Sequence, residues 1–205
     1  MNLTKYKRLL ENHIENGFVF YFSLMIIFIT GVVIGSVMIK LLDTEIQEKI
    51  LNYTSVYFHS FNNNLLNLSI FKTCLLFRTI TIMVMYIIGL LNIGILIPIL
   101  ILVQGGALGF NVGYIINYFG FKGFLISIFA YFPQHVIFIP SLIILGALSM
   151  TMANKYKLSS NKRVFRINKM NVFEYTIFNI IFSCFVLIGI LYEGYIAPIF
   201  LNMIT

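Results

Sequence analysis

Long apolar runs, separated by polar segments, divide the chain from one end to the other. The first run covers residues 18–39, and its length of about 22 residues is enough to cross a bilayer as a helix. A cleavable signal peptide would have an apolar core of only about 7–15 residues, followed by a small-residue cleavage site. Residues 18–39 therefore predict a signal anchor. The polar residues 1–17 before it carry Leu9, Leu10 and Ile14 at helical spacing, which predicts an amphipathic helix on the lipid headgroups.

Four further spans are expected after residue 73. Asn92, Gly94 and Pro98 mark a tight turn between the second and third spans. The fourth run is too long for one straight span and contains Pro133 and Pro140, so we expect a half-helix, a break at Pro133 and then a full span. The pattern predicts an all-α, polytopic protein with about five transmembrane helices in a single domain over residues 18–205. The later spans are expected at about 75–92, 97–119, 124–152 and 175–198.

Residues 40–73, between the first and second expected spans, form the only long polar loop before residue 154. Asp43 is a plausible helix N-cap, and apolar residues then recur in steps of three or four from Ile46 to Phe61. This stripe predicts an amphipathic helix on the outer membrane surface, which either covers the bundle or docks a partner. The candidate partner-facing residues of the stripe are Tyr53, Tyr57 and Phe61.

The distribution of basic residues sets the expected orientation. Residues 154–171 contain six basic residues and no acid, and the N-terminal segment is also basic, so both are expected in the cytoplasm. Four spans between them agree with this placement. The loop 40–73 and the C-terminus then lie outside a multi-pass protein of the plasma membrane. Arg78, at the outer end of the second span, is expected to snorkel toward the headgroups.

The composition excludes a soluble fold. Hydrophobic residues make up 60% of the 205 residues and charged residues only 10%, against about 25% charged in soluble domains. The net charge is +7, and the basic residues lie at the ends of apolar runs. This placement indicates that they set the membrane topology and contact anionic lipid, rather than bind nucleic acid. Two cysteines do not make a disulfide framework.

Acidic residues are absent from the expected spans at 18–39 and from residues 79–152. Proton relays and cation-coupled transporters usually place an ionisable group at membrane depth, so this absence counts against both. The three histidines have no metal-ligand spacing, and no metal or other cofactor is expected. Ser127 or Ser141 with His135 is a formal nucleophile–base pair, but without an orienting third group no enzymatic activity is expected.

Small residues recur on two of the expected spans. Glycines four residues apart leave one face of each helix almost without side chains, which permits close helix–helix approach in lipid. Gln104 and Asn111 fall on roughly the opposite face of the third span, where they could hydrogen-bond to another helix. The glycine faces could pack within the chain, form a homodimer or line a pore. Their members are Gly31 and Gly35 on the first span, and Gly105, Gly109 and Gly113 on the third.

The segment from Phe132 to Pro140 is the other distinctive feature. Pro133 suits a first helical turn, so Gln134 and His135 are expected at a helix N-terminus inside the bundle. Such a break can form a ligand site, which would fit a small-solute transporter or channel subunit that uses Gln104, Asn111 and Gln134. It can equally be a structural kink.

These motifs, in this order, resemble the stage II sporulation protein M family of endospore-forming bacteria. The resemblance covers nearly the whole chain and rests mainly on three stretches. They are QGGALGFNVGYIINYFG at 104–120, FPQHVIFIP at 132–140 and YEGYIAP at 192–198.

The resemblance implies a scaffold in the mother-cell membrane that engulfs the forespore. It implies two partners, stage II sporulation proteins D and P, which degrade peptidoglycan on the outer side while this chain organises them. Glu193 and Tyr195, in the third stretch, are then further partner-facing candidates outside the cell. Related proteins of the wider superfamily carry a Pro-His-Gly-x-x-Glu-like pattern at the break. Pro133, Gln134, His135 and Phe138 stand at those positions here, so the His and Glu are replaced, which favours a scaffold.

Overall fold

The computed structural model describes residues 3–43, 45–47, 49–50, 66–91, 93–157 and 172–191, and these are helical apart from short turns. The long helices are α1 (Leu3–Met38), α3 (Leu66–Leu90), α4 (Leu96–Phe119), α6 (Phe132–Lys157) and α7 (Val172–Leu191). The short elements are the 3-10 turn η1 (Ile39–Leu41), α5 (Phe121–Ile126) and the π-helical segment η2 (Ser127–Tyr131).

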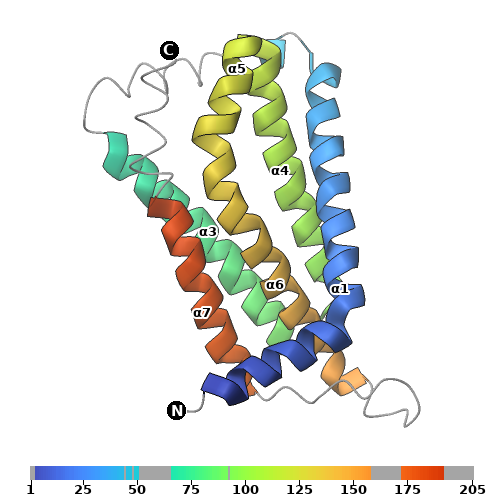
Figure 1. Ribbon diagram of the computed structural model, residues 1–205. Helices are drawn as coiled ribbons and strands as arrows, with labels where there is room; N and C mark the ends of the chain where they lie inside the picture. Colours follow the sequence, from blue (N-terminus) through green and yellow to red (C-terminus); the bar gives the residue numbers. More distant parts are fainter. Residues whose placement is uncertain are drawn as a thin grey trace.

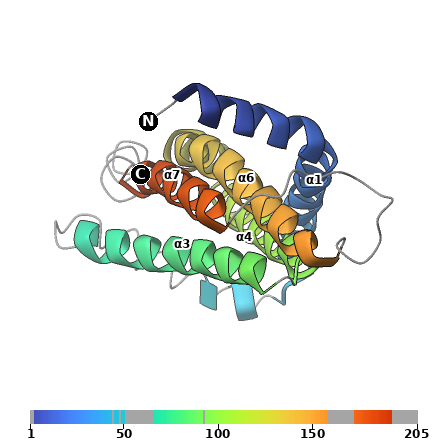
Figure 2. The same cartoon turned by 90° about the horizontal axis from the view of Figure 1, so that it is seen from below.

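The long helices form one bundle in which consecutive members run in opposite directions (Figure 1). Seen from below, α6 lies among the other helices, and it contacts α1, α3, α4 and α7 (Figure 2). The most extensive contact is between α1 and α4. The N-terminal part of α1, drawn in deep blue, lies across the lower end of the bundle, as a helix on a membrane surface would (Figure 1).

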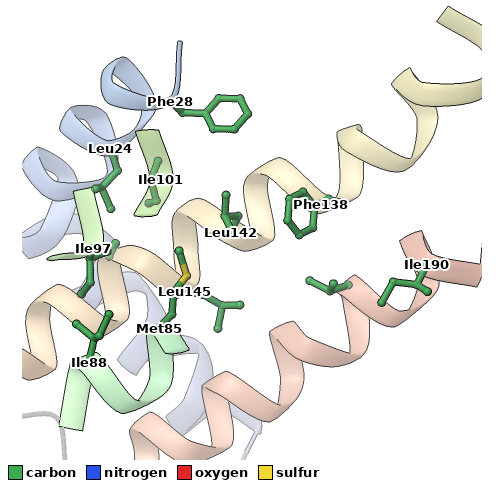
Figure 3. Close-up of a cluster of buried hydrophobic side chains, with 12 residues drawn as sticks. Leu24, Phe28, Met85, Ile88, Ile97, Ile101, Phe138, Leu142, Leu145 and Ile190 are labelled. Carbon is green, nitrogen blue, oxygen red and sulfur yellow. The ribbon is translucent and has the colours of Figure 1, made fainter. Parts of the chain in front are cut away.

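The centre of the bundle is apolar and is built mainly on α6. Leu142 and Leu145 of α6 meet Leu24 of α1, Met85 of α3 and Ile101 of α4, all of them fully buried (Figure 3). Most large apolar side chains on the outside remain exposed, which is the pattern expected of a bundle surrounded by lipid. The buried side chains are therefore buried by contact between helices, whereas apolar side chains on the outside of the bundle stay exposed.

Four of the described helices are long and apolar enough to cross a membrane, and a shorter apolar helix accompanies them. The four candidate spans are Phe18–Leu41, Leu96–Phe119, Phe132–Ala153 and Val172–Leu191. The shorter apolar helix is Leu75–Leu90, within α3. The all-helical, multi-pass architecture predicted from the sequence is thus confirmed, with four candidate spans established by length and composition.

The prediction of an interrupted helix at Pro133 is corrected by the structure. The backbone dihedral angles of Ile126, Ser127 and Phe132 are all right-handed helical, and α5, η2 and α6 follow one another without a non-helical residue. The backbone N–H of Phe132 donates to the carbonyl of Ser127, the i to i+5 bond of a π-helix. Because Pro133 has no N–H, the carbonyl of Phe129 loses its usual i+4 donor, and the wider π turn lies where that bond is missing. Pro140 likewise lies inside α6 rather than at its end.

The start of the 40–73 loop is partly described. Helical turns begin after Asp43, whose carbonyl accepts from the N–H groups of Ile46 and Gln47 at 3.0 and 3.1 Å. Lys49 donates to Glu45 at 2.7 Å one turn apart. The rest of the predicted stripe, including Tyr53, Tyr57 and Phe61, lies outside the described residues, as do Glu193, Tyr195 and residues 158–171.

Candidate functional site

The glycine faces of α1 and α4 pack directly against each other. A Cβ added to Gly35 would overlap the carbonyl of Gly106, and one added to Gly109 would overlap the carbonyl of Val32. Backbone overlaps of this kind occur at four of the five glycines, so the backbones touch where side chains would otherwise separate them, while Gly113 would meet the side chain of Ile39. The further overlaps are Gly31 with Leu102, Gly105 with Phe28, and Gly113 with Ile39.

All five predicted packing glycines therefore lie in one interface inside the chain. Of the three arrangements considered for them, the structure displays packing between helices of one molecule. In this conformation α1 covers the glycine face of α4, so a second copy could reach that face only by displacing α1. The interface fixes α1 to α4 and makes these two helices a unit within the bundle.

Gln104 and Asn111 both lie on α4, but their surroundings differ. The side-chain amide of Gln104 donates to the hydroxyl of Thr81 on α3 at 3.0 Å, and so joins these two helices. Asn111 lies on the outside of the bundle and is exposed. Gln134 is on α6, 3% exposed, with its backbone carbonyl next to Gly189 of α7. The three polar residues named for a solute pathway thus do not converge on one site.

The start of α6 holds a small set of buried polar groups. The Oε1 atom of Gln134 is buried and has no hydrogen-bond partner in the described part of the chain. The ring of His135 lies edge-on to that of Phe138, with centroids 6.2 Å apart. The hydroxyls of Ser127 and Ser141 each donate to a carbonyl one turn earlier in the helix, at 2.8 and 2.9 Å. Hydroxyls held in this way are ordinary helix contacts and are not poised against His135.

Arg78 does not extend toward the headgroups as the sequence suggested. Its guanidinium carbon lies 3.8 Å from the centroid of the Phe138 ring, so the side chain turns onto α6 as a cation–π contact. Phe138 is six residues into the candidate span Phe132–Ala153, or about 9 Å along the helix axis. Arg78 therefore links α3 to α6 beside a candidate membrane span, where a charged group usually has a functional reason.

One polar junction was missed by sequence reasoning. Tyr175, fully buried near the start of α7, shares a 2.8 Å hydrogen bond with Ser149 of α6 and donates to the carbonyl of Tyr86 of α3 at 3.2 Å. The rings of Tyr86 and Tyr175 are stacked with centroids 5.2 Å apart. Gly89 leaves room for the Tyr175 hydroxyl, because a Cβ there would overlap it. The sequence held no signal for this junction, because the burial of Tyr175 and its partners on other helices are visible only in the structure.

No group of three or more His, Cys, Asp or Glu side chains that could hold a metal ion is found among the described residues. The described part of the chain therefore offers helix-packing faces, one tyrosine-centred junction and one arginine–phenylalanine contact between α3 and α6. Each of these joins helices to one another.

A family model described as Stage II sporulation protein M matches residues 24–198, which is well over half of the chain. The match includes residues 24–38 of α1 and the whole of α3, α4, α6 and α7. No curated protein and no solved structure matches the chain.

Proposed function

The chain belongs to the stage II sporulation protein M family, and from that premise we propose that it is a non-enzymatic membrane scaffold for peptidoglycan hydrolases during forespore engulfment. Family membership suggests a sporulation membrane protein. The finer role, which includes stage II sporulation proteins D and P as the hydrolases that are held, is our proposal.

The observation that supports it most strongly is how the polar groups of the bundle are used. Gln104 bonds Thr81, Tyr175 bonds Ser149, and the glycine faces of α1 and α4 close on each other. These contacts hold helices together around a mainly apolar core. A bundle held together in this way suits a platform that binds its partners at the ends of its helices.

We propose that the platform crosses the membrane five times, with α3 as the additional span. α3 has 25 residues, about 37 Å at 1.5 Å per residue, although its apolar part, Leu75–Leu90, is shorter. A crossing α3 puts the N-terminus and the basic residues 158–171 on the same side, as the positive-inside rule requires. The end of the bundle that carries η1 and α5 then faces the cell wall (Figure 1).

The expected loop 40–73 is shorter in the structure, because residues 66–73 already belong to α3. The proposed dock is the segment 42–65 between η1 and α3, together with the segment after α7. We expect a tagged chain from sporulating cells to co-purify with both hydrolases in mild detergent. Replacement of residues 51–65 by a polar linker of equal length should abolish co-purification while leaving membrane insertion intact. The matched control replaces residues 158–171 with a linker of the same length and charge, and it should retain both partners. Full recovery of the partners with the 51–65 replacement would exclude this loop as the dock.

A further inference from the structure

The chain leaves helical geometry at Leu42, directly after η1. Leu42 has extended dihedral angles, with φ −75° and ψ 138°, and helix resumes at residues 45–47 and 49–50, which we call the loop helix. The last carbonyl groups of a helix have no donor within that helix and need one from elsewhere. The backbone N–H of Leu42 donates to the carbonyl of Ile39, but this bond is long, at 3.3 Å. The carbonyls at this end of α1 and η1 can therefore accept a further donor.

Gln47, in the loop helix, supplies that donor. Its half-buried side-chain amide donates to the carbonyl of Leu42 at 2.9 Å and, over a longer distance of 3.4 Å, to the carbonyl of Ile39. The two acceptors are five and eight residues earlier in the chain, so they lie outside the loop helix. One amide thus bonds the loop helix to the end of the first span.

The bonds of Gln47 differ from those of other polar side chains nearby. The hydroxyls of Thr30 and Ser36 donate to carbonyls three residues earlier in α1, so they do not fix one element against another. Lys49 and Glu45 pair within the loop helix, and their side chains are 66% and 79% exposed, where an ion pair contributes little. Gln47, in contrast, joins two separate elements.

Ile39 connects this bond to the rest of the bundle. Its side chain is 2% exposed, and its Cδ1 atom lies 2.8 Å from the position that a Cβ on Gly113 of α4 would take. The residue whose carbonyl accepts from Gln47 is therefore packed against α4. Because the glycine faces hold α1 and α4 together, Gln47 fixes the loop helix to both of them rather than to α1 alone.

We propose that Gln47 is a positioning residue for the dock, and that it sets the direction in which the segment 42–65 leaves the bundle. This inference rests on the proposed function, in which that segment binds the hydrolases. Loss of the Gln47 bonds frees the dihedral angles of Leu42, and the loop helix then pivots there. A dock held in one direction loses less conformational freedom when a partner binds than one that pivots, and so it binds more tightly.

Three variants of the full chain test this role. Gln47→Leu removes the amide donors at a similar side-chain size. Gln47→Lys keeps a donor on a flexible stem and is the rescue variant. Lys49→Gln is the matched control in the same helix, because it removes only the exposed pair with Glu45.

Two measurements are made on each variant. The first is the distance distribution between spin labels on Ile46→Cys and Leu91→Cys, by pulsed electron paramagnetic resonance in liposomes, in a background with Cys74→Ser and Cys184→Ser. Ile46 and Leu91 are both exposed, and they follow the opposite ends of the bundle reached by η1 and by α3. The second measurement is co-purification of both hydrolases with the tagged chain from sporulating cells.

We expect a narrow distance distribution with Gln47 present, a broader one in Gln47→Leu, and a return to a narrow one in Gln47→Lys. Lys49→Gln should match the chain that has both residues intact. Co-purification should fall about tenfold in Gln47→Leu, because binding must then order the pivoting segment, and it should recover in Gln47→Lys.

A distribution in Gln47→Leu as narrow as in the unsubstituted chain would overturn the inference, and so would equal broadening in Lys49→Gln. Broadening in Gln47→Leu with undiminished co-purification would also overturn it, while leaving the proposed dock in place. If the unsubstituted chain captures neither hydrolase, the proposed function fails and the docking role of Gln47 fails with it. The distance distributions separate these cases, because they are measured without a partner.

Discussion

Neighbouring glycines on α4 differ in what an added methyl group would meet. A Cβ at Gly109 would overlap the carbonyl of Val32, whereas a Cβ at Gly106 has only the carbonyl oxygen of Gly31 within reach, at 3.6 Å. Gly109→Ala should therefore lower the free energy of unfolding by about 1–3 kcal/mol, as overpacking does. Gly106→Ala should leave it unchanged or slightly higher, because alanine favours helix.

Thermal unfolding in a mild detergent, followed by circular dichroism, measures the difference between the two variants. Because both substitutions add one methyl group to the same helix, a change common to both would reflect helix propensity alone. Equal midpoints for the two variants would contradict the close contact between α1 and α4.

The junction at Tyr175 gives a second prediction for single residues. Tyr175→Phe removes the hydroxyl that bonds Ser149 and the carbonyl of Tyr86, and leaves buried polar groups without that partner. We expect a loss of about 1–3 kcal/mol in unfolding free energy. Tyr118→Phe, which removes the hydroxyl of a half-exposed tyrosine on α4, is the control and should change little.

A double-mutant cycle sharpens this test. Gly89→Ala should destabilise the wild-type chain, because the new methyl group would overlap the Tyr175 hydroxyl. It should cost less in the Tyr175→Phe background, where that oxygen is gone, so the two effects should not add. Strictly additive effects would show that Gly89 and Tyr175 are not coupled.

At the residue scale, the sequence predicted features that depend on a repeated pattern. It did not predict contacts that a single side chain makes with another helix. The four-residue spacing of Gly105, Gly109 and Gly113 marked a packing face, because any close helix contact in lipid needs small residues. Arg78 was expected to snorkel, since its position on α3 says nothing about the ring of Phe138 lying beside it. Tyr175 was missed because its two partners, Ser149 and the carbonyl of Tyr86, lie on other helices.

Among the elements, the π-helical segment η2 gives the sharpest prediction. A π turn holds one residue more than an α turn, so removal of one residue from Ser127–Tyr131 can restore α geometry and keep both flanking helices in register. Deletion of Phe129, which is exposed, should therefore yield a folded, inserted chain. Deletion of Leu142, in the middle of α6, would rotate the remainder of that helix by about 100° and should prevent folding.

Expression level in the membrane and a monodisperse elution profile distinguish these deletions. The comparison is direct because each removes one apolar residue from the same continuous helical stretch. If both deletions fail to the same extent, the π segment does not absorb a change of register.

Proline placement explains why this element could not be predicted fully. Pro133 shows from the sequence that one backbone hydrogen bond of the helix must be missing. The sequence does not show whether the chain forms a loop or a wider helical turn at that point. In hydrocarbon a loop would leave several carbonyls unsatisfied, whereas a π turn replaces most of the bonds. Surrounding hydrocarbon therefore favours the π turn over a loop. Pro140 is accommodated within α6 for the same reason.

For the whole molecule, the bundle followed from hydrophobic runs alone, because every run long enough to span became a helix. What the runs could not specify is which helices touch. The pairing of α1 with α4, which are far apart in the chain, depends on two glycine faces that fit each other. The central place of α6 is visible in its candidate span, which is the most buried of the four.

Whether α3 crosses the membrane decides the orientation of everything after it, and two positions that flank α3 can settle the matter. Lys40 and Leu91 are both exposed and lie before and after that helix. Five spans place Lys40 outside and Leu91 in the cytoplasm, whereas four spans without α3 place them on the same side. Single cysteines at either position, in a background with Cys74→Ser and Cys184→Ser, report this through a membrane-impermeant maleimide.

We expect Lys40→Cys to be labelled in intact cells, and Leu91→Cys only after the membrane is permeabilised. Lys122→Cys, in α5 at the opposite end of α4 from Leu91, should behave like Lys40→Cys, because an odd number of crossings separates Leu91 from each of them. Labelling of Leu91→Cys and Lys40→Cys under the same condition would mean that α3 lies along the surface. The basic segment 158–171 would then face the opposite side from the N-terminus, against the positive-inside rule. α5 would face the side opposite to η1, so the proposed outer end that carries both would have to be abandoned.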